Sequence, residues 1–155
     1  EHWDKGLDDL LIESSDLAFK SAGIAKQDID AYWLGTAQSA MSGIALARPL
    51  QLQGKPVTRV ENYCATGSEA LRQACYAVAS GAYDSAMAIG AEKVKDSGMQ
   101  GLNAFPVPND GTARTLTAAA MFSMVAPAYA QKYGVDRADL KRVLARIASK
   151  NHANG

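Results

Sequence analysis

The spacing of apolar residues over roughly the first ninety positions constrains the fold more than any other feature of this sequence. Three short segments rich in apolar, aromatic or β-branched residues are typical of strands: residues 29–35, 57–62 and 85–91. Three longer segments repeat their apolar residues at helical spacing: residues 7–22, 43–51 and 64–81. Gly23 supplies a stop for the first of these helices. Alternating helices and strands predict a layered α/β fold.

A different pattern begins near residue 96. Glycines and prolines interrupt residues 96–115, which is typical of a long loop. Helical spacing returns over residues 117–133, and Asp136 predicts the N-cap of a last helix. One apolar stripe runs along this last helix: Leu140, Val143, Leu144 and Ile147. We therefore expect a core unit, residues 1–95, and an excursion from its sheet with returning helices, residues 96–155.

Charge and composition exclude several classes of protein. Sixteen basic residues balance sixteen acidic ones, so no overall field favours nucleic acid or an anionic membrane. No apolar run approaches the roughly 20 residues that span a bilayer. Two cysteines without a Cys/His cluster predict neither a disulfide framework nor a metal site. We expect a protein of the reducing cytoplasm with no membrane span, no metal and no nucleic-acid partner.

Cys64 has the clearest chemical potential. It lies where the predicted strand 57–62 runs into a helix, and the unpaired N–H groups of a helix start stabilise a thiolate. The small residues Ala65 and Gly67 would let a substrate approach, and the N–H of Cys64 could donate to an oxyanion. The alternative is that Cys64 is a small buried packing residue. The predicted inner face of the same helix consists of Leu71, Ala74, Cys75 and Val78. Cys75 is expected to be structural because it lies on this face, and it is too far along the helix to form a disulfide with Cys64.

Three segments resemble the thiolase superfamily in order and spacing: residues 60–71 with Cys-Ala-Thr-Gly, residues 77–81 with Ala-Ser-Gly, and residues 90–94 with Gly-Ala-Glu-Lys. The likeness is greatest to bacterial and archaeal acetyl-CoA acetyltransferases and to sterol-carrier-protein-type thiolases. It implies a layered αβαβα fold in the complete enzyme, with a mixed sheet and helices on both faces. The family's first strand and its C-terminal half are missing, so the resemblance implies an N-terminal fragment.

The resemblance also implies that Cys64 is the catalytic nucleophile. It would attack an acyl-CoA thioester and carry the acyl group, which a second acyl-CoA or free CoA then accepts. Coenzyme A enters as part of the substrate, so no separate cofactor is implied. Family members also use a histidine in a Gly-His-Pro motif and a second cysteine in a Cys-Gly-rich motif, and neither motif occurs here. We therefore expect the fragment to be inactive by itself.

Three further residues are candidates for substrate binding on the same resemblance. Met121 and Phe122 fall near the position that lines the family's acyl pocket, and their alternative role is core packing. His152 lies where the CoA-binding excursion returns to the core. Its alternative role is structural, because a lone histidine lacks the orienting partner that a base requires. Family likeness further implies a homo-oligomer, either a dimer or a tetramer.

Two other functions remain open on the same fold. A condensing enzyme of the ketosynthase or hydroxymethylglutaryl-CoA synthase type would also acylate Cys64. A thiolase-like subunit without thiolysis would instead act as a scaffold or as part of a complex with a small acyl-CoA-binding partner protein. Co-purification with a partner that is required for activity would favour this last reading.

Overall fold

The structure, a computed structural model, describes residues 2–97 and 118–154. It divides into two compact units, Glu1–Met99 and Gln100–Gly155. The loop predicted over residues 96–115 lies outside the described residues from residue 98 onward. Each unit has its own elements and its own packing.

The first unit follows the predicted alternation of helices and strands, so the α/β class is confirmed. Its elements are α1 Leu7–Ala22, a 3₁₀ helix Lys26–Asp28, β1 Ala31–Gly35, α2 Ile44–Ala47, β2 Val57–Val60, a 3₁₀ helix Tyr63–Ala65, α3 Thr66–Ala79, β3 Ala86–Gly90 and a 3₁₀ helix Val94–Ser97. Gly23 ends α1 in the left-handed conformation, as predicted. The helix predicted over residues 43–51 is only one turn long. Pro49 has no N–H to continue its ladder, and Gln51 adopts a positive φ of 53°.

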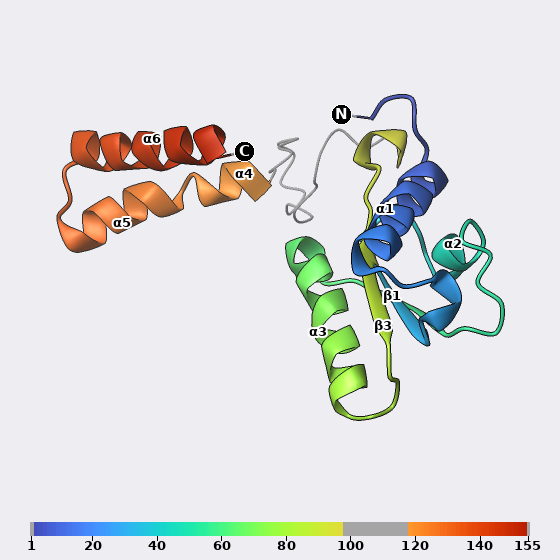
Figure 1. Ribbon diagram of the computed structural model, residues 1–155. Helices are drawn as coiled ribbons and strands as arrows, with labels where there is room; N and C mark the ends of the chain where they lie inside the picture. The colour runs from blue at the N-terminus through green and yellow to red at the C-terminus, as the bar shows by residue number, and fades with distance from the viewer. Residues whose placement is uncertain (1, 98–117, 155) are drawn as a thin grey trace, which may run out of the picture. The chain divides into compact units, whose positions relative to one another are not determined.

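The three strands form one parallel sheet in the order β2-β1-β3 (Figure 1). Gly35 at the end of β1 pairs with Val60 of β2 and with Gly90 of β3. All three strands therefore end at one edge, which we call the carboxyl edge, and begin at the opposite, amino edge. Every strand pair within residues 2–97 is parallel, so these residues show no antiparallel partner of the kind that a mixed sheet contains.

Helices cover both faces of this sheet (Figure 1). On one face α1 and α2 pack on alternate strand residues, and the buried cluster consists of Leu11, Ile29, Tyr32, Leu34, Leu46, Leu50, Met87 and Ile89. On the other face α3 packs on the intervening residues, and the cluster consists of Ala31, Trp33, Val60, Ala70 and Ala74. Successive strand side chains point to opposite faces, so β1 is buried on both. This accounts for the unbroken apolar character of its sequence.

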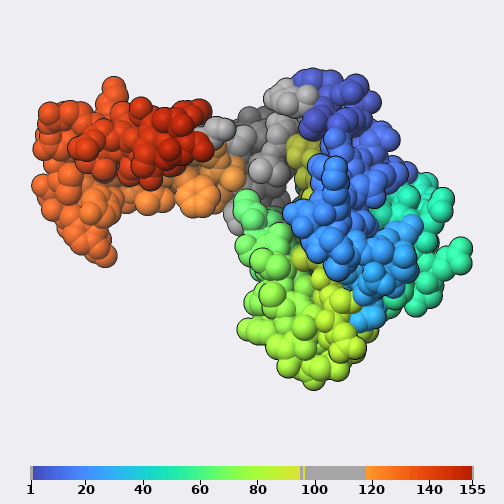
Figure 2. Space-filling model, in the orientation of Figure 1, coloured from blue at the N-terminus to red at the C-terminus, as the bar shows by residue number. Residues whose placement is uncertain are grey.

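Helix α3 contacts the sheet through its smallest side chains. Thr66, Ala70 and Ala74 are its buried residues. Three residues that the helical spacing predicted to face inward are exposed: Leu71, Cys75 and Val78. The predicted inner face is therefore wrong except at Ala74, because a helix approaches a sheet closely where its side chains are small, and the larger ones remain outside. Figure 2 shows the outer surface of α3 in green on the first unit.

The described part of the second unit is helical. Its elements are α4 Ala118–Phe122, α5 Val125–Tyr133 and α6 Arg137–Asn154. The single helix predicted over residues 117–133 is two helices, since Pro127 has no N–H to donate to the preceding turn. Asp136 accepts two backbone N–H groups at the start of α6, which confirms the N-cap. Helix α6 has no buried residue: in its apolar stripe Leu140 is partly buried, and Val143, Leu144 and Ile147 are exposed within the described residues. Among the described helices, none is both long and apolar enough to cross a membrane.

Candidate functional site

Cys64 lies at the carboxyl edge of the sheet, on the turn between β2 and α3. The 3₁₀ helix Tyr63–Ala65 carries it, and α3 begins at Thr66, two residues later than predicted. The Cys64 side chain is exposed, so a buried packing role is wrong within the described residues. Cys64 therefore lies two residues before the first residue of the helix instead of forming that residue.

Residues 61–65 connect β2 to α3, and we call them the cysteine turn. The hydroxyl of Thr66 fixes the conformation of this turn. Its Oγ1 accepts the N–H of Asn62 at 2.8 Å and donates to the carbonyl of Tyr63 at 2.6 Å. The N–H of Ala65 donates to the carbonyl of Asn62 at 3.0 Å. Thr66 is itself buried, so its side chain is held by the packing of α3 on the sheet. The backbone on both sides of Cys64 is thus fixed by short-range hydrogen bonds.

Backbone strain marks the same turn. Tyr63 has a φ of 46°, a region that residues with a Cβ rarely adopt. Its N–H donates to Oε1 of Glu61 at 2.6 Å. A left-handed residue other than glycine costs about 1–2 kcal/mol and persists where surrounding bonds over-determine it. The bonds from Thr66 and Glu61 do this here, and such strain is most often found at functional sites.

Both ends of the cysteine turn rest on the end of β1. At the first end, the N–H of Thr36 donates to the carbonyl of Val60 at 3.4 Å. At the second end, Gly35 lies directly against Thr66: a Cβ added to Gly35 would be 3.2 Å from both Cγ2 and the carbonyl oxygen of Thr66. The close approach of α3 therefore favours glycine at this position, because a larger residue would push Thr66 away by a few tenths of an ångström. The placement of Cys64 depends on residues 35 and 36.

Glu92 follows β3 and binds the loop after β1. Its carboxylate accepts the backbone N–H groups of Ala37, Gln38 and Ser39 at 2.7, 3.1 and 2.7 Å. The hydroxyls of Ser39 and Thr36 also donate to it, at 2.6 and 3.3 Å. Burial raises the pKa of Glu92, but the hydroxyl of Ser39 and the three N–H groups outweigh it and hold the pKa below its usual value. Glu92 is thus an ionised group that fixes residues 36–39, and we call it the carboxyl clamp.

Arg59 of β2 holds the same loop through its carbonyl groups. Its Nη2 donates to the carbonyls of Thr36 and Ala37, each at 2.9 Å. Its Nε is buried and has no hydrogen-bond partner among the described residues. The sequence analysis missed Arg59, and it noted Glu92 only as part of a motif. The available signal was a charged residue inside an apolar strand or directly after one.

A second carboxylate joins β1 to β3 at the amino edge. Oδ2 of Asp30 accepts the N–H groups of Ser85 and Asp84 at 3.0 and 3.1 Å, and the hydroxyl of Ser85 at 3.1 Å. The pKa of Asp30 is held below its usual value, mainly by the backbone N–H of Ser85 and next by the hydroxyl of Ser85. We call Asp30 the amino clamp. The two clamps thus fix the two ends of the same strand pair.

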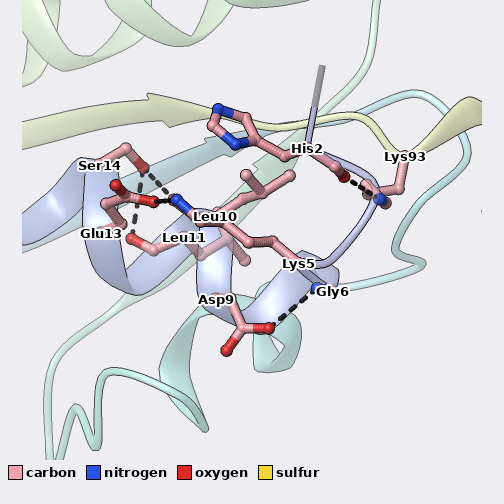
Figure 3. Close-up of polar contacts among 9 residues, drawn as sticks. All are labelled: His2, Lys5, Gly6, Asp9, Leu10, Leu11, Glu13, Ser14 and Lys93. Atoms are coloured by element: carbon pink, nitrogen blue, oxygen red, sulfur yellow. Dashed lines mark hydrogen bonds and ion pairs between the residues drawn. The ribbon is translucent and has the colours of Figure 1, made fainter.

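The segment before α1 is tied to the residue after Glu92. Nζ of Lys93 donates to the carbonyl of His2 at 3.0 Å, and the N–H of Lys93 donates to Oγ of Ser39 at 2.6 Å. Figure 3 shows the first of these contacts beside the ion pair of Lys5 with Glu13 on α1. The carboxyl clamp is therefore continuous with contacts that reach the beginning of the described chain.

An open hollow lies beside the cysteine turn. It is lined by Val60, Glu61, Asn62, Glu69, Arg72 and Gln73. Hydrogen bonds from Arg72 and then Gln73 hold the pKa of Glu69 below its usual value, since both donate to its carboxylate. The guanidinium in this hollow is thus already paired with a carboxylate.

The three predicted substrate-binding residues belong to the second unit. Met121 is partly buried in α4, Phe122 at the end of α4 is 74% exposed, and His152 is exposed near the end of α6. Their role in binding stays a prediction. Within the described residues, no group of three or more His, Cys, Asp or Glu side chains could hold a metal ion.

Comparison with known proteins identifies the family to which the chain belongs. The family described as "Thiolase, N-terminal domain" matches residues 2–155. The chain therefore belongs to the thiolase family, and the resemblance drawn from its motifs is confirmed.

Three relatives show how much of a thiolase-family protein the chain matches. It is 33% identical to the acetyl-CoA acetyltransferase of Methanocaldococcus jannaschii over 97% of its length. It is 30% identical to the acetyl-CoA acetyltransferase of Methanothermobacter thermautotrophicus over 99% of its length, and 30% identical to sterol carrier protein 2 of Gallus gallus over 94%. The match spans 41% of each archaeal protein and 28% of the chicken protein.

Proposed function

We propose that the complete protein is an acyl-CoA acyltransferase of the thiolase type, in which Cys64 accepts the acyl group. The observation that carries this proposal is an exposed thiol on a strained turn. The hydroxyl of Thr66 binds the backbone of Asn62 and Tyr63 before the thiol, and the N–H of Ala65 after it binds the carbonyl of Asn62. The names of the two archaeal relatives support an acyl-CoA substrate. Because the match covers 41% of those relatives, we assign the activity to the longer protein and not to this segment alone.

The proposed reaction has two halves. In the first, the Cys64 thiolate attacks the carbonyl carbon of the thioester, and the carbonyl electron pair moves to oxygen. The resulting oxyanion collapses and expels CoA thiolate, which takes up a proton. In the second half, a second acetyl-CoA that has lost an α-proton attacks the acyl group and frees the cysteine. In the degradative direction, the thiolate of free CoA is the attacking group.

The described residues would contribute the nucleophile and part of its surroundings. The backbone N–H of Cys64 is proposed as a donor to the oxyanion. Gly67 would leave space for the thioester, because a Cβ added there would meet no atom of the described residues within 4 Å. The family resemblance places the proton-transferring histidine and second cysteine in motifs that these 155 residues do not contain.

Acyl transfer to Cys64 can be tested on the full-length protein. It would be incubated with isotopically labelled acetyl-CoA, quenched in acid, digested and mapped by mass spectrometry. We expect the label on the peptide that contains Cys64, and none on the peptide that contains Cys75, which serves as the internal control. Labelling at another residue, or no labelling of an intact and folded protein, would overturn the proposal. Acylation without thiolysis would favour a condensing enzyme of another type.

We further propose that the complete protein is a cytoplasmic homo-oligomer that uses no cofactor besides the CoA thioester. Family likeness supports this proposal. Sedimentation velocity of the full-length protein over a range of concentrations measures the oligomeric state directly. A monomer at every concentration would contradict the oligomer.

A further inference from the structure

We propose that Glu92 is a positioning residue for Cys64: by holding residues 36–39 at the carboxyl edge, its carboxylate fixes the turn that carries the thiol. This inference rests on the proposed function, in which Cys64 is the nucleophile. It adds a residue that would touch neither substrate nor thiol and would act through the backbone of a neighbouring loop.

The first step of the argument is the number of bonds that converge on Glu92. Three consecutive backbone N–H groups and two hydroxyls donate to its two oxygens. Hydrogen bonds to a charged acceptor are about twice as strong as neutral ones. A loop that directs three successive amides at one carboxylate has little freedom to change its conformation, so Glu92 determines the path of residues 37–39.

The second step is the opposite charge on the carbonyl side of the same loop. Arg59 donates to the carbonyls of Thr36 and Ala37, while Glu92 accepts the N–H groups of Ala37 and Gln38. The peptide dipoles between them are therefore aligned from an anion to a cation. Both charges favour one orientation of these peptides.

The third step connects this loop to Cys64. Thr36 begins the clamped loop, and its N–H binds the carbonyl of Val60, the last residue of β2. Gly35 precedes it and lies against Thr66. The hydroxyl of Thr66 then binds the backbone of Asn62 and Tyr63, the two residues that precede the thiol. A continuous series of contacts thus runs from Glu92 to the residues that flank Cys64.

The fourth step separates positioning from stability alone. Asp30 joins the same two strands at the other edge with the same kind of bonds. Its loss should loosen the sheet as the loss of Glu92 would, but at the end that lies away from the cysteine turn. Asp30→Asn is therefore the matched control for Glu92→Gln, because both replacements keep the side chain's shape and remove its charge.

The experiment compares these two variants in the full-length protein. The first readout is the rate constant for alkylation of Cys64 by iodoacetamide at fixed pH, followed by mass spectrometry of the peptide. The second is the pair of kinetic constants for acetyl-CoA turnover, kcat and KM. Thermal unfolding of each variant measures the loss of stability. The effects of the two replacements on alkylation and on kcat can then be compared with the stability that each one loses.

Both variants should unfold at a lower temperature, but only Glu92→Gln should change the chemistry. Alkylation of Cys64 should slow about two- to fivefold, the size of a helix-terminus effect on a charged group, because a mobile thiolate spends less time in the field of the α3 start. The value of kcat should fall roughly tenfold or more with little change in KM, as expected when geometry at the reacting atom is lost.

Equal effects of Glu92→Gln and Asp30→Asn on alkylation and on kcat would overturn the inference. If Glu92→Gln does not fold, Ser39→Ala removes one donor to Glu92 and should slow alkylation in the same direction by a smaller factor. No change in that folded variant would also count against the inference. Alkylation does not require acyl transfer. The alkylation rates therefore test the positioning of Cys64 even if no acyl adduct forms on it and the proposed function fails.

Discussion

The two edges of the sheet are built alike and differ in what they hold. At the amino edge Asp30 accepts hydrogen bonds from the residues before β3, and at the carboxyl edge Glu92 accepts them from the loop after β1. Each carboxylate joins β1 to β3. Within the described residues, Thr36 of the loop at the carboxyl edge and Gly35 directly before it also contact the two ends of the cysteine turn. A carboxylate that joins β1 to β3 therefore stabilises the sheet at the amino edge. At the carboxyl edge, the same arrangement also holds a loop that contacts the turn with Cys64.

The largest expected effect comes from replacing the nucleophile at the carboxyl edge. Cys64→Ser in the full-length protein should lower kcat by about 10⁴-fold or more, because a hydroxyl is a far weaker nucleophile than a thiolate near neutral pH. Cys75→Ser is the matched control and should keep its activity, since Cys75 lies further along α3 and away from the turn. Steady-state assays of acetyl-CoA turnover measure both. Full activity of Cys64→Ser would remove the functional distinction between the two edges.

Removing the hydroxyl that fixes the cysteine turn should have the next largest effect. Thr66→Val keeps the side chain's shape but loses the bonds to Asn62 and Tyr63, so the free energy of unfolding should fall by about 1–3 kcal/mol. The value of kcat should fall roughly tenfold or more as the turn loosens. At the amino edge, Ser85→Ala removes the hydroxyl that bridges Asp28 and Asp30 and should lower stability without lowering kcat.

Urea unfolding and kinetic assays on the same preparations test this pair. Thr66→Ser retains the hydroxyl and should recover most of the activity that Thr66→Val loses. A loss of kcat in Ser85→Ala as large as that in Thr66→Val would show that the edges are not functionally different.

Acid should weaken both edges in the same way. The pKa values of Asp30 and Glu92 are held below those of the unfolded chain, so each group binds fewer protons when folded. Its contribution is complete above the unfolded pKa, near pH 4, and is lost as the pH falls through the lower folded value. Amide and hydroxyl donors lower the pKa of both carboxylates, and Lys55 adds a smaller lowering at Asp30.

Thermal unfolding between about pH 6 and pH 3 checks this expectation. The melting temperature of the unmodified protein should fall more steeply below about pH 4 than that of Asp30→Asn or of Glu92→Gln. The two single variants should have similar slopes. A variant that follows the unmodified protein at every pH would show that its carboxylate contributes no pH-dependent stability.

The smallest effect is expected at Gly67, in the first turn of α3. A Cβ there enters open space, so Gly67→Ala should raise the free energy of unfolding by about 0.5–1 kcal/mol while hindering the approach of a thioester. Gly23→Ala is the contrasting control: it too has open space, but its φ of 68° strains any side chain, so stability should fall. Chemical unfolding measures the change in the free energy of unfolding for both variants, and we expect an increase for Gly67→Ala and a decrease for Gly23→Ala. A Gly67→Ala protein that is more stable and fully active would place the substrate elsewhere.

Much of the fold follows from local sequence. The segments that become β1 and β3 are predicted by their unbroken apolar residues, which suit strands covered on both faces, and β2 is predicted by its β-branched residues. Gly23 and Asp136 are predicted because the ends of helices have specific backbone requirements. Helix lengths are less well predicted, since Pro49 and Pro127 shorten two helices whose apolar spacing continues past them.

By itself the sequence determined the order of the elements, the thiolase family and the position of Cys64 between a strand and a helix, because each depends on residues close together in the chain. The tertiary structure decided which face of α3 is buried, and it placed Gly35 and Thr36 against the cysteine turn. It also brought Glu92 to a loop more than fifty positions earlier. Parallel pairing places the ends of distant strands side by side, so contacts between their loops depend on the sheet and not on neighbouring residues.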